Sequence, residues 1–211
     1  MEAGAQQPPR SAQALSAQRA LAVAKTRAAQ PSGWWGMALF LCAEGTLFGI
    51  LIATYFYLDF DAHSWPPDGI KAPSVVLPLI AAGVLISTSV PMVGAVRAAR
   101  AGRRGTVIGL IALAVAVQAA YLAGQVLLFR HDLLQFTPKG SAYGSIYFTL
   151  LAAHHAHVIL GILLELVVLG QVALRGLTDY WVIGARSVAL YWHVVNVLAV
   201  FVVLTQLSPS L

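Results

Sequence analysis

The chain has few charged residues. Only 10% of its 211 residues are Asp, Glu, Lys or Arg, while 59% are hydrophobic. A soluble domain carries about 25% charged residues, so this composition cannot cover a water-facing surface. The sequence therefore indicates an integral membrane protein. The excess of Lys and Arg does not indicate nucleic-acid binding, because most of these residues flank apolar segments.

Several chemical signatures are also missing. Cys42 is the single cysteine, which excludes an internal disulfide and a metal cluster held by thiolates of this chain alone. The sequence has no glycine-rich phosphate-binding loop and no Gly-x-Ser-x-Gly motif. The commonest nucleotide-binding and hydrolase classes therefore receive no support.

The chain does contain five long apolar segments, each with about the 20 residues that a membrane-spanning helix needs. They cover residues 34–58, 75–96, 106–129, 145–170 and 187–207. No segment alternates with the short period of a membrane strand. The sequence thus predicts an all-α fold, a polytopic membrane bundle with five transmembrane helices. Pro78 and Pro91 predict a bend in the second helix.

Residues 1–33 contain no apolar run, so they do not form a secretory signal. We expect a polar cytoplasmic tail with a surface helix over residues 14–29, although the scarcity of acidic residues also gives a weak likeness to a transit peptide. Residues 34–211 are then one five-helix transmembrane domain.

Basic residues are divided unequally between the two sides of the predicted bundle. Ten lie before the first segment and in the second and fourth loops, and three lie in the remaining loops. Cytoplasmic loops carry the excess of Lys and Arg, which predicts the N-terminus inside and the C-terminus outside. The ten are Arg10, Arg19, Lys25, Arg27, Arg97, Arg100, Arg103, Arg104, Arg175 and Arg186, and the three are Lys71, Arg130 and Lys139.

Two carboxylates lie inside the apolar segments, although a charge at mid-membrane costs on the order of 2.5–3.5 kcal/mol or more. Glu44 should be roughly 15 Å deep at about 1.5 Å per residue, and we expect it to act in function or in lipid contact. A protonated carboxyl bonded to a polar neighbour is the structural alternative. Glu165 lies close to the cytoplasmic end of the fourth segment, so we expect it to be shallow enough to reach the interface.

The fourth segment carries a polar stripe. At about 100° per residue, one arc of the helix takes in His154, His157, Glu165, Tyr147 and Gly161. The stripe must face protein, since lipid would leave its hydrogen bonds unmade.

The fifth segment places His193 and Asn196 on one face, three residues apart. His154 and His157 have the same three-residue spacing, and two histidines so spaced on a helix can bind one metal ion. A haem would need a second histidine on another helix at the same depth. His154 and His193 differ in depth by several ångströms, so we expect hydrogen bonds between helices, and no metal bound by this chain.

Four motifs resemble subunit III of the haem-copper cytochrome c and quinol oxidases. The first segment reads WGMALFLCAEGTLF over residues 35–48, and the following loop reads WPPDGI over residues 65–70. The fourth segment contains YGS at residues 143–145 and HHAHV at residues 154–158, and the fifth contains YWHVVN at residues 191–196. The resemblance extends over about residues 34–207. It departs from the family where Leu128 replaces a usual glutamate after Gln125, and Glu165 is not a family position.

The resemblance implies a non-catalytic subunit that packs beside subunit I in a complex with subunits I and II. Haem a and copper would lie in those partners, and contacts with the electron donor would too. This chain would hold phospholipid, support proton uptake and protect against inactivation during turnover. Glu44 matches the family's buried carboxylate, His154 and His157 its H-x-x-H pair, and His193 its closing histidine. Five helices correspond to the short form found in bacterial cell membranes, without two N-terminal helices.

The leading hypothesis is therefore subunit III of an aa3-type terminal oxidase, which reduces oxygen to water and pumps protons. An accessory membrane subunit of a nitric oxide reductase is the alternative within the same fold. Two other classes stay open: a small proton-coupled transporter using Glu44, Glu165 and the histidines, and a di-haem electron-transfer protein. The choice between cytochrome c and quinol as donor is not encoded in these residues.

Overall fold

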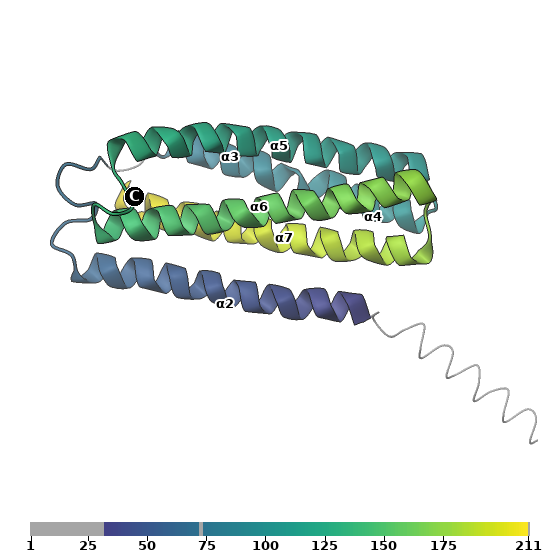
Figure 1. Cartoon of the computed structure of the whole chain (residues 1–211), viewed down its shortest axis with the longest axis horizontal. Coiled ribbons are helices and arrows are strands. Elements are labelled where there is room, and N and C mark those ends of the chain that lie inside the picture. Colours follow the sequence, from purple (N-terminus) through teal and green to yellow (C-terminus); the bar gives the residue numbers. More distant parts are fainter. Residues whose placement is uncertain (1–31, 72–73, 211) are drawn as a thin grey trace, which may run out of the picture.

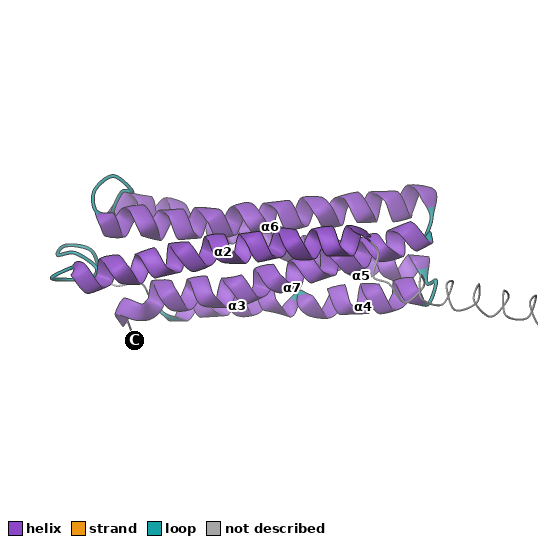
Figure 2. Ribbon diagram, turned by 90° about the horizontal axis from the view of Figure 1, so that it is seen from below, coloured by secondary structure: helices purple, strands orange, loops and turns teal. Residues whose placement is uncertain are grey.

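The computed structural model describes residues 32–71 and 74–210. Within these ranges the regular elements are helices, with no strand (Figures 1 and 2). Residues 1–31, which hold most of the expected tail and its helix at 14–29, lie outside the described part. The helices are α2 (Ser32–Asp61), α3 (Val76–Ser87), α4 (Ser89–Arg100), α5 (Arg104–Gln135), α6 (Ala142–Arg175) and α7 (Asp179–Leu207), followed by a 3₁₀ turn, η1 (Ser208–Ser210).

Five helices in the described part are long and apolar enough to cross a membrane, when α3 and α4 are taken as one span from Val76 to Arg100. This confirms the predicted class and number of spans. The boundaries were predicted too short, since α5 has 32 residues and α6 has 34. The extra turns carry charged and polar residues, which apolar length alone does not detect but which a helix accommodates at the membrane interface.

The second span breaks once, at Thr88. The amide of Thr88 bonds to the carbonyl of Leu85 at 3.1 Å, a tighter pattern than the α-helical one. Pro91 explains this break, because it offers no N–H and its ring crowds the carbonyl four residues earlier. The bend predicted from Pro78 is not found: Pro78 lies in the first turn of α3, where its amide would have no partner within the helix.

Four spans form a ring in the order α3/α4, α5, α6 and α7, each in contact with the next and α7 with the first. Helix α2 lies outside this ring, against both α6 and α7 (Figures 1 and 2). Its buried residues Leu41, Phe48 and Tyr55 recur every seven positions, as expected for one seam against two neighbouring helices. Helix α7 touches every other span except α5 and is the most buried of the five.

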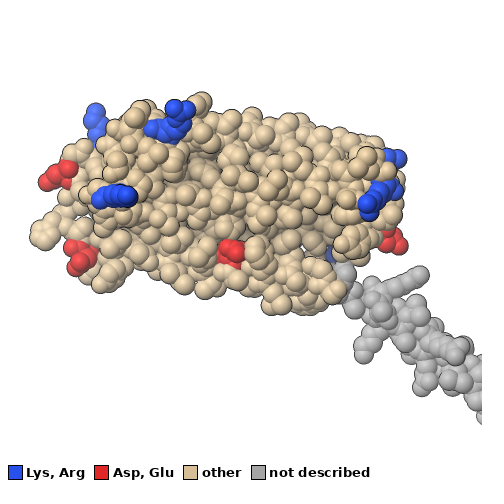
Figure 3. All heavy atoms as spheres, in the orientation of Figure 1, with Lys and Arg blue, Asp and Glu red and all other residues tan. Residues whose placement is uncertain are grey.

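The long sides of the bundle are apolar, and its charges gather at the two ends (Figure 3). Leu39, Ile50, Val90 and Leu127 are all at least 60% exposed, as lipid-facing residues are. One end carries six arginines and one acidic residue, and the other carries three basic and four acidic residues. The first set is Arg97, Arg100, Arg103, Arg104, Arg175, Arg186 and Asp179; the second is Lys71, Arg130, Lys139, Asp59, Asp61, Asp68 and Asp132.

Candidate functional site

Glu44 and His157 form a hydrogen-bonded pair between α2 and α6. The Oε2 atom of Glu44 lies 2.8 Å from Nε2 of His157. The two residues come from helices that are separated in the chain by more than a hundred residues. Glu44 occupies the α2 seam midway between Leu41 and Phe48, so the same pattern that packs α2 also aims this carboxyl at α6.

The second ring nitrogen of His157 defines the proton arrangement. Nδ1 lies 2.7 Å from the carbonyl oxygen of Ala153, and a carbonyl can only accept, so Nδ1 carries a hydrogen. Nε2 and the Glu44 carboxyl then share one further proton. Whether that proton resides on nitrogen or on oxygen, the pair is neutral overall. Placing it in an apolar layer therefore costs much less free energy than placing a net charge there.

The pair lies at the edge of the bundle and not at its centre. The side chain of Glu44 is 20% exposed and that of His157 is 12% exposed. Figure 3 shows one acidic side chain on the long apolar side, away from both charged ends. The ring of Phe48 meets the imidazole edge-on at 5.1 Å, and the Tyr191 hydroxyl donates to the carbonyl of His157 at 2.9 Å. Three helices, α2, α6 and α7, therefore hold this polar pair where lipid can reach it.

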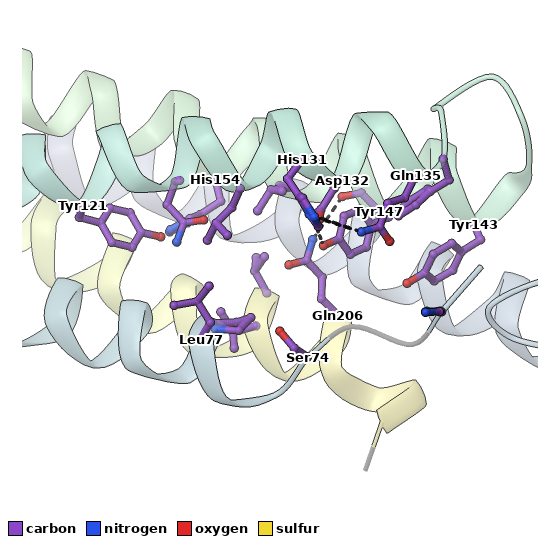
Figure 4. A pocket seen from close by; sticks show the side chains of 18 residues that line it. Ser74, Leu77, Tyr121, His131, Asp132, Gln135, Tyr143, Tyr147, His154 and Gln206 are labelled. Carbon is purple, nitrogen blue, oxygen red and sulfur yellow. Dashed lines mark hydrogen bonds and ion pairs between the residues drawn. The ribbon is translucent and has the colours of Figure 1, made fainter. Parts of the chain in front are cut away.

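His154 is placed differently, although it is on the same stripe of α6. It is buried, and neither of its ring nitrogens has a hydrogen-bond partner among the described residues. It faces into the four-helix ring and lines a cavity there (Figure 4). The two histidines of the H-x-x-H motif therefore have different surroundings: His157 bonds to α2, and His154 faces the interior of the four-helix ring.

Glu165 does not reach the interface, contrary to our expectation. It is completely buried, and its Oε1 atom accepts a hydrogen bond of 3.0 Å from Nε2 of Gln118 on α5. The prediction was wrong because the sequence does not show which helix lies opposite this carboxyl: Glu165 packs against α5 and is bonded there to Gln118.

His193 and Asn196 meet at a single hydroxyl, that of Ser89 at the start of α4. Asn196 Nδ2 donates to Ser89 Oγ at 2.8 Å, and His193 Nδ1 lies 3.2 Å from the same oxygen. Next to them, Trp192 Nε1 donates to Thr88 Oγ1 at 2.6 Å. The YWHVVN motif of α7, residues 191–196, therefore binds this helix to the break in the second span through hydrogen bonds.

The loop motifs are structural. The ring of Trp65 packs edge-on against Tyr55 at 5.3 Å and against Tyr143 at 5.0 Å, joining the 62–75 loop to α2 and α6. A Cβ at Gly144 would lie 2.5 Å from the carbonyl oxygen of Thr137, so only glycine permits this close approach. Ser145 Oγ donates to the carbonyl of Pro138. These contacts set the start of α6, and with it the depth of the histidines.

The described residues contain no group of three or more His, Cys, Asp or Glu side chains arranged to hold a metal ion. His154, His157 and His193 each face a different neighbour, so they do not converge on one ligand. The arrangement provides interhelical contacts, a shared proton and an internal cavity.

Sequence reasoning missed Gln118, Thr88, Ser89 and Arg104. Arg104 donates to the carbonyls of Val172 at 3.0 Å and of Ala173 at 2.7 Å, which satisfies the last turn of α6. Gln118 did carry a signal, because an amide inside an apolar segment needs a partner just as a carboxyl does. Thr88 and Ser89 gave little signal, since short hydroxyls often bond to their own helix.

Comparison with known proteins gives a consistent result. The family described as cytochrome c oxidase subunit III matches residues 13–207. Cytochrome bo(3) ubiquinol oxidase subunit 3 of Pseudomonas aeruginosa is 29% identical over 168 residues, which are 78% of each chain. Cytochrome c oxidase subunit 3 of Bacillus subtilis is 30% identical over 172 residues, 81% of each chain. Probable quinol oxidase subunit 3 of Staphylococcus haemolyticus is 30% identical over 171 residues, 81% of this chain and 84% of that one.

The family match over residues 13–207 covers all four motifs, and the comparisons agree with the resemblance seen in the motifs alone. The chain belongs to the subunit III family of the haem-copper cytochrome c and quinol oxidases, and is therefore a membrane subunit of an oxidoreductase complex of the respiratory chain.

Proposed function

We propose that the chain is the non-catalytic subunit III of an aa3-type terminal oxidase in a bacterial cell membrane. It packs beside subunit I, in a complex that also contains subunit II, and haem a and copper are held by those partners. Its task is to retain phospholipid, to support proton uptake by the complex and to prolong its activity during turnover.

The observation that carries this proposal is the Glu44–His157 pair. Its 2.8 Å contact is an interhelical hydrogen bond that also holds an exchangeable proton. Its 20% exposed carboxyl opens onto the apolar side of the bundle, where an ordered water could bond to it and a lipid chain could lie against it. A purely structural bond could be buried completely, as the Glu165–Gln118 bond is.

The test replaces Glu44 in the assembled oxidase. Glu44→Gln keeps the size and the hydrogen-bonding ability of the side chain, but an amide has no acidic proton to share with His157. The complex should assemble with an unchanged visible spectrum. It should complete severalfold fewer turnovers before inactivation, or retain less phospholipid per haem.

A matched control is available on the same helix. Asp61 is an exposed carboxylate at the last position of α2, and Asp61→Asn makes the same carboxyl-to-amide change without touching the pair. This variant should match the wild type in both measurements. If Glu44→Gln also matches the wild type in turnover stability and in bound lipid, Glu44 has no such role.

The electron donor follows from the partners and is measured on the same preparation. The relatives are named partly as cytochrome c oxidases and partly as quinol oxidases. Oxygen consumption with reduced cytochrome c and with a quinol, each supplied alone, assigns the complex to one group or the other.

A further inference from the structure

A cavity of about 340 Å³, lined by both polar and apolar side chains, lies inside the four-helix ring. It is bounded by α3, α5, α6 and α7 and does not include α2 or the Glu44–His157 pair. Its outer end is at the level of Asp132, Gln135 and Gln206, where α5 and α7 end (Figure 4). Its inner end is formed by Tyr121 and His154, which lie in the middle third of their helices.

The inner end contains hydrogen-bonding groups that the protein does not satisfy. His154 is 3% exposed, and both of its ring nitrogens are without a partner among the described side chains and backbone groups. The hydroxyl of Tyr143, nearer the outer end of the same cavity, also has no hydrogen-bond partner among the described residues. Each buried polar atom left without a bond costs about 1–3 kcal/mol, so a stable fold needs a partner for them inside the cavity.

The outer half of the cavity contains a series of polar groups. Tyr147 donates to Asp132 at 3.0 Å, and Gln206 donates to the carbonyl of Tyr147 at 3.3 Å. Gln125 of α5 lines the stretch between these groups and Tyr121. Polar groups therefore continue from the charged end of the bundle to His154, and apolar residues such as Leu128 and Leu151 fill the spaces between them.

We propose that this cavity is a water-filled inlet. It is open to the aqueous phase at the end of the bundle that carries Asp132, and it ends at His154. Its volume holds roughly ten water molecules at about 30 Å³ each. Water supplies both a donor and an acceptor, as the two nitrogens of a neutral imidazole require. A dry cavity of this size would be lined by apolar groups throughout, which this one is not. The inlet brings water, and with it an exchangeable proton, to a histidine deep inside the membrane.

Cysteine accessibility tests the inlet. Cys42 is the single cysteine, so Cys42→Ser gives a background without thiols. Leu151 lines the cavity, whereas its neighbour Leu150 is fully buried in the packed core one residue nearer the outer end. A small water-soluble methanethiosulfonate reacts only with a hydrated thiol. In open membrane fragments that expose both faces, Leu151→Cys should react at least tenfold faster than Leu150→Cys.

A second pair on α5 repeats the comparison. Gln125 lines the cavity, and Leu127 is 68% exposed on the lipid side at nearly the same depth. Gln125→Cys should react at least tenfold faster than Leu127→Cys. Equal rates within both pairs would overturn the proposal, because a lipid chain or protein packing would then fill the cavity.

A measurement on the unaltered complex guards against folding defects in the variants. Hydroxyl radicals generated by X-ray radiolysis oxidise side chains that lie beside water. Leu151 should be oxidised well above Leu150 in the same digest. Oxidation of both leucines at one background rate would contradict the inlet even if every cysteine variant failed to fold.

Discussion

Trp192 of α7 lies directly against Gly161 of α6. A Cβ placed on Gly161 would come within 2.6 Å of the indole Cζ3 atom and within 3.2 Å of the ring of Tyr191. The indole can approach α6 this closely only because residue 161 has no side chain, and from that position its nitrogen reaches Thr88 at 2.6 Å. One glycine therefore permits the contact that links α6, α7 and the break in the second span.

Gly161→Ala should destabilise the subunit by about 1–3 kcal/mol, because the added methyl forces a large buried ring to move. The thermal unfolding midpoint of the complex in detergent checks this. Gly170→Ala on the same helix is the control, since no atom lies within 4 Å of the added Cβ. Alanine there should be neutral or stabilising by up to about 1 kcal/mol. Equal midpoints for the two variants would contradict the proposed packing role.

Ser89→Ala should cost about 1–3 kcal/mol, because it removes the shared partner of His193 and Asn196 in one step. Ser87→Ala provides the comparison two residues earlier, where the hydroxyl is exposed and bonds only to the carbonyl of Val84 in its own helix. Thermal unfolding of the two variants should separate them clearly. A loss as large in Ser87→Ala would mean that the effect is a local helix property.

Gln118 and Glu165 should be strongly coupled. Gln118→Leu leaves a buried carboxyl without its partner and should cost about 1–3 kcal/mol. Glu165→Gln keeps an acceptor in the same place and should cost less than Gln118→Leu. A double-mutant cycle with Gln118→Leu and Glu165→Leu should give a coupling energy of at least about 0.5 kcal/mol. Strict additivity would show that the bond does not contribute to stability.

We predict the membrane orientation from the six arginines at one end of the bundle, which should be the cytoplasmic end. A C-terminal fusion to alkaline phosphatase should be active, and a C-terminal fusion to green fluorescent protein should be dark, since the C-terminus is predicted outside. Fusions after Arg103, in the turn between α4 and α5, should give the opposite pair of results. Fluorescence at the C-terminus would reverse the orientation.

The number and type of the spans were predictable, because an apolar segment of about 20 residues in lipid has few structural solutions. The family was predictable as well, since four motifs keep their order and spacing. The boundaries of the spans were less predictable, because the helices continue beyond the apolar segments to charged residues such as Arg104 and Arg175. The burial of Glu165 was missed because its partner, Gln118, lies on another helix.

The sequence alone could not show which residues on other helices the site residues would contact. Helical periodicity placed His154 and His157 on one side of α6, but it does not say which helix lies opposite each residue. The two histidines differ by 60° around the helix axis at about 100° per residue. In the ring of helices that difference is enough to bring His157 to α2 and to leave His154 facing the cavity.

Co-purification decides whether the chain is a subunit of a terminal oxidase. A tagged chain is extracted in mild detergent, and the visible spectrum and oxygen consumption of the material that accompanies it are recorded. We predict a larger subunit that carries haem a, together with oxygen reduction by the complex. Haem b with turnover of nitric oxide, or a colourless chain without partners, would contradict it.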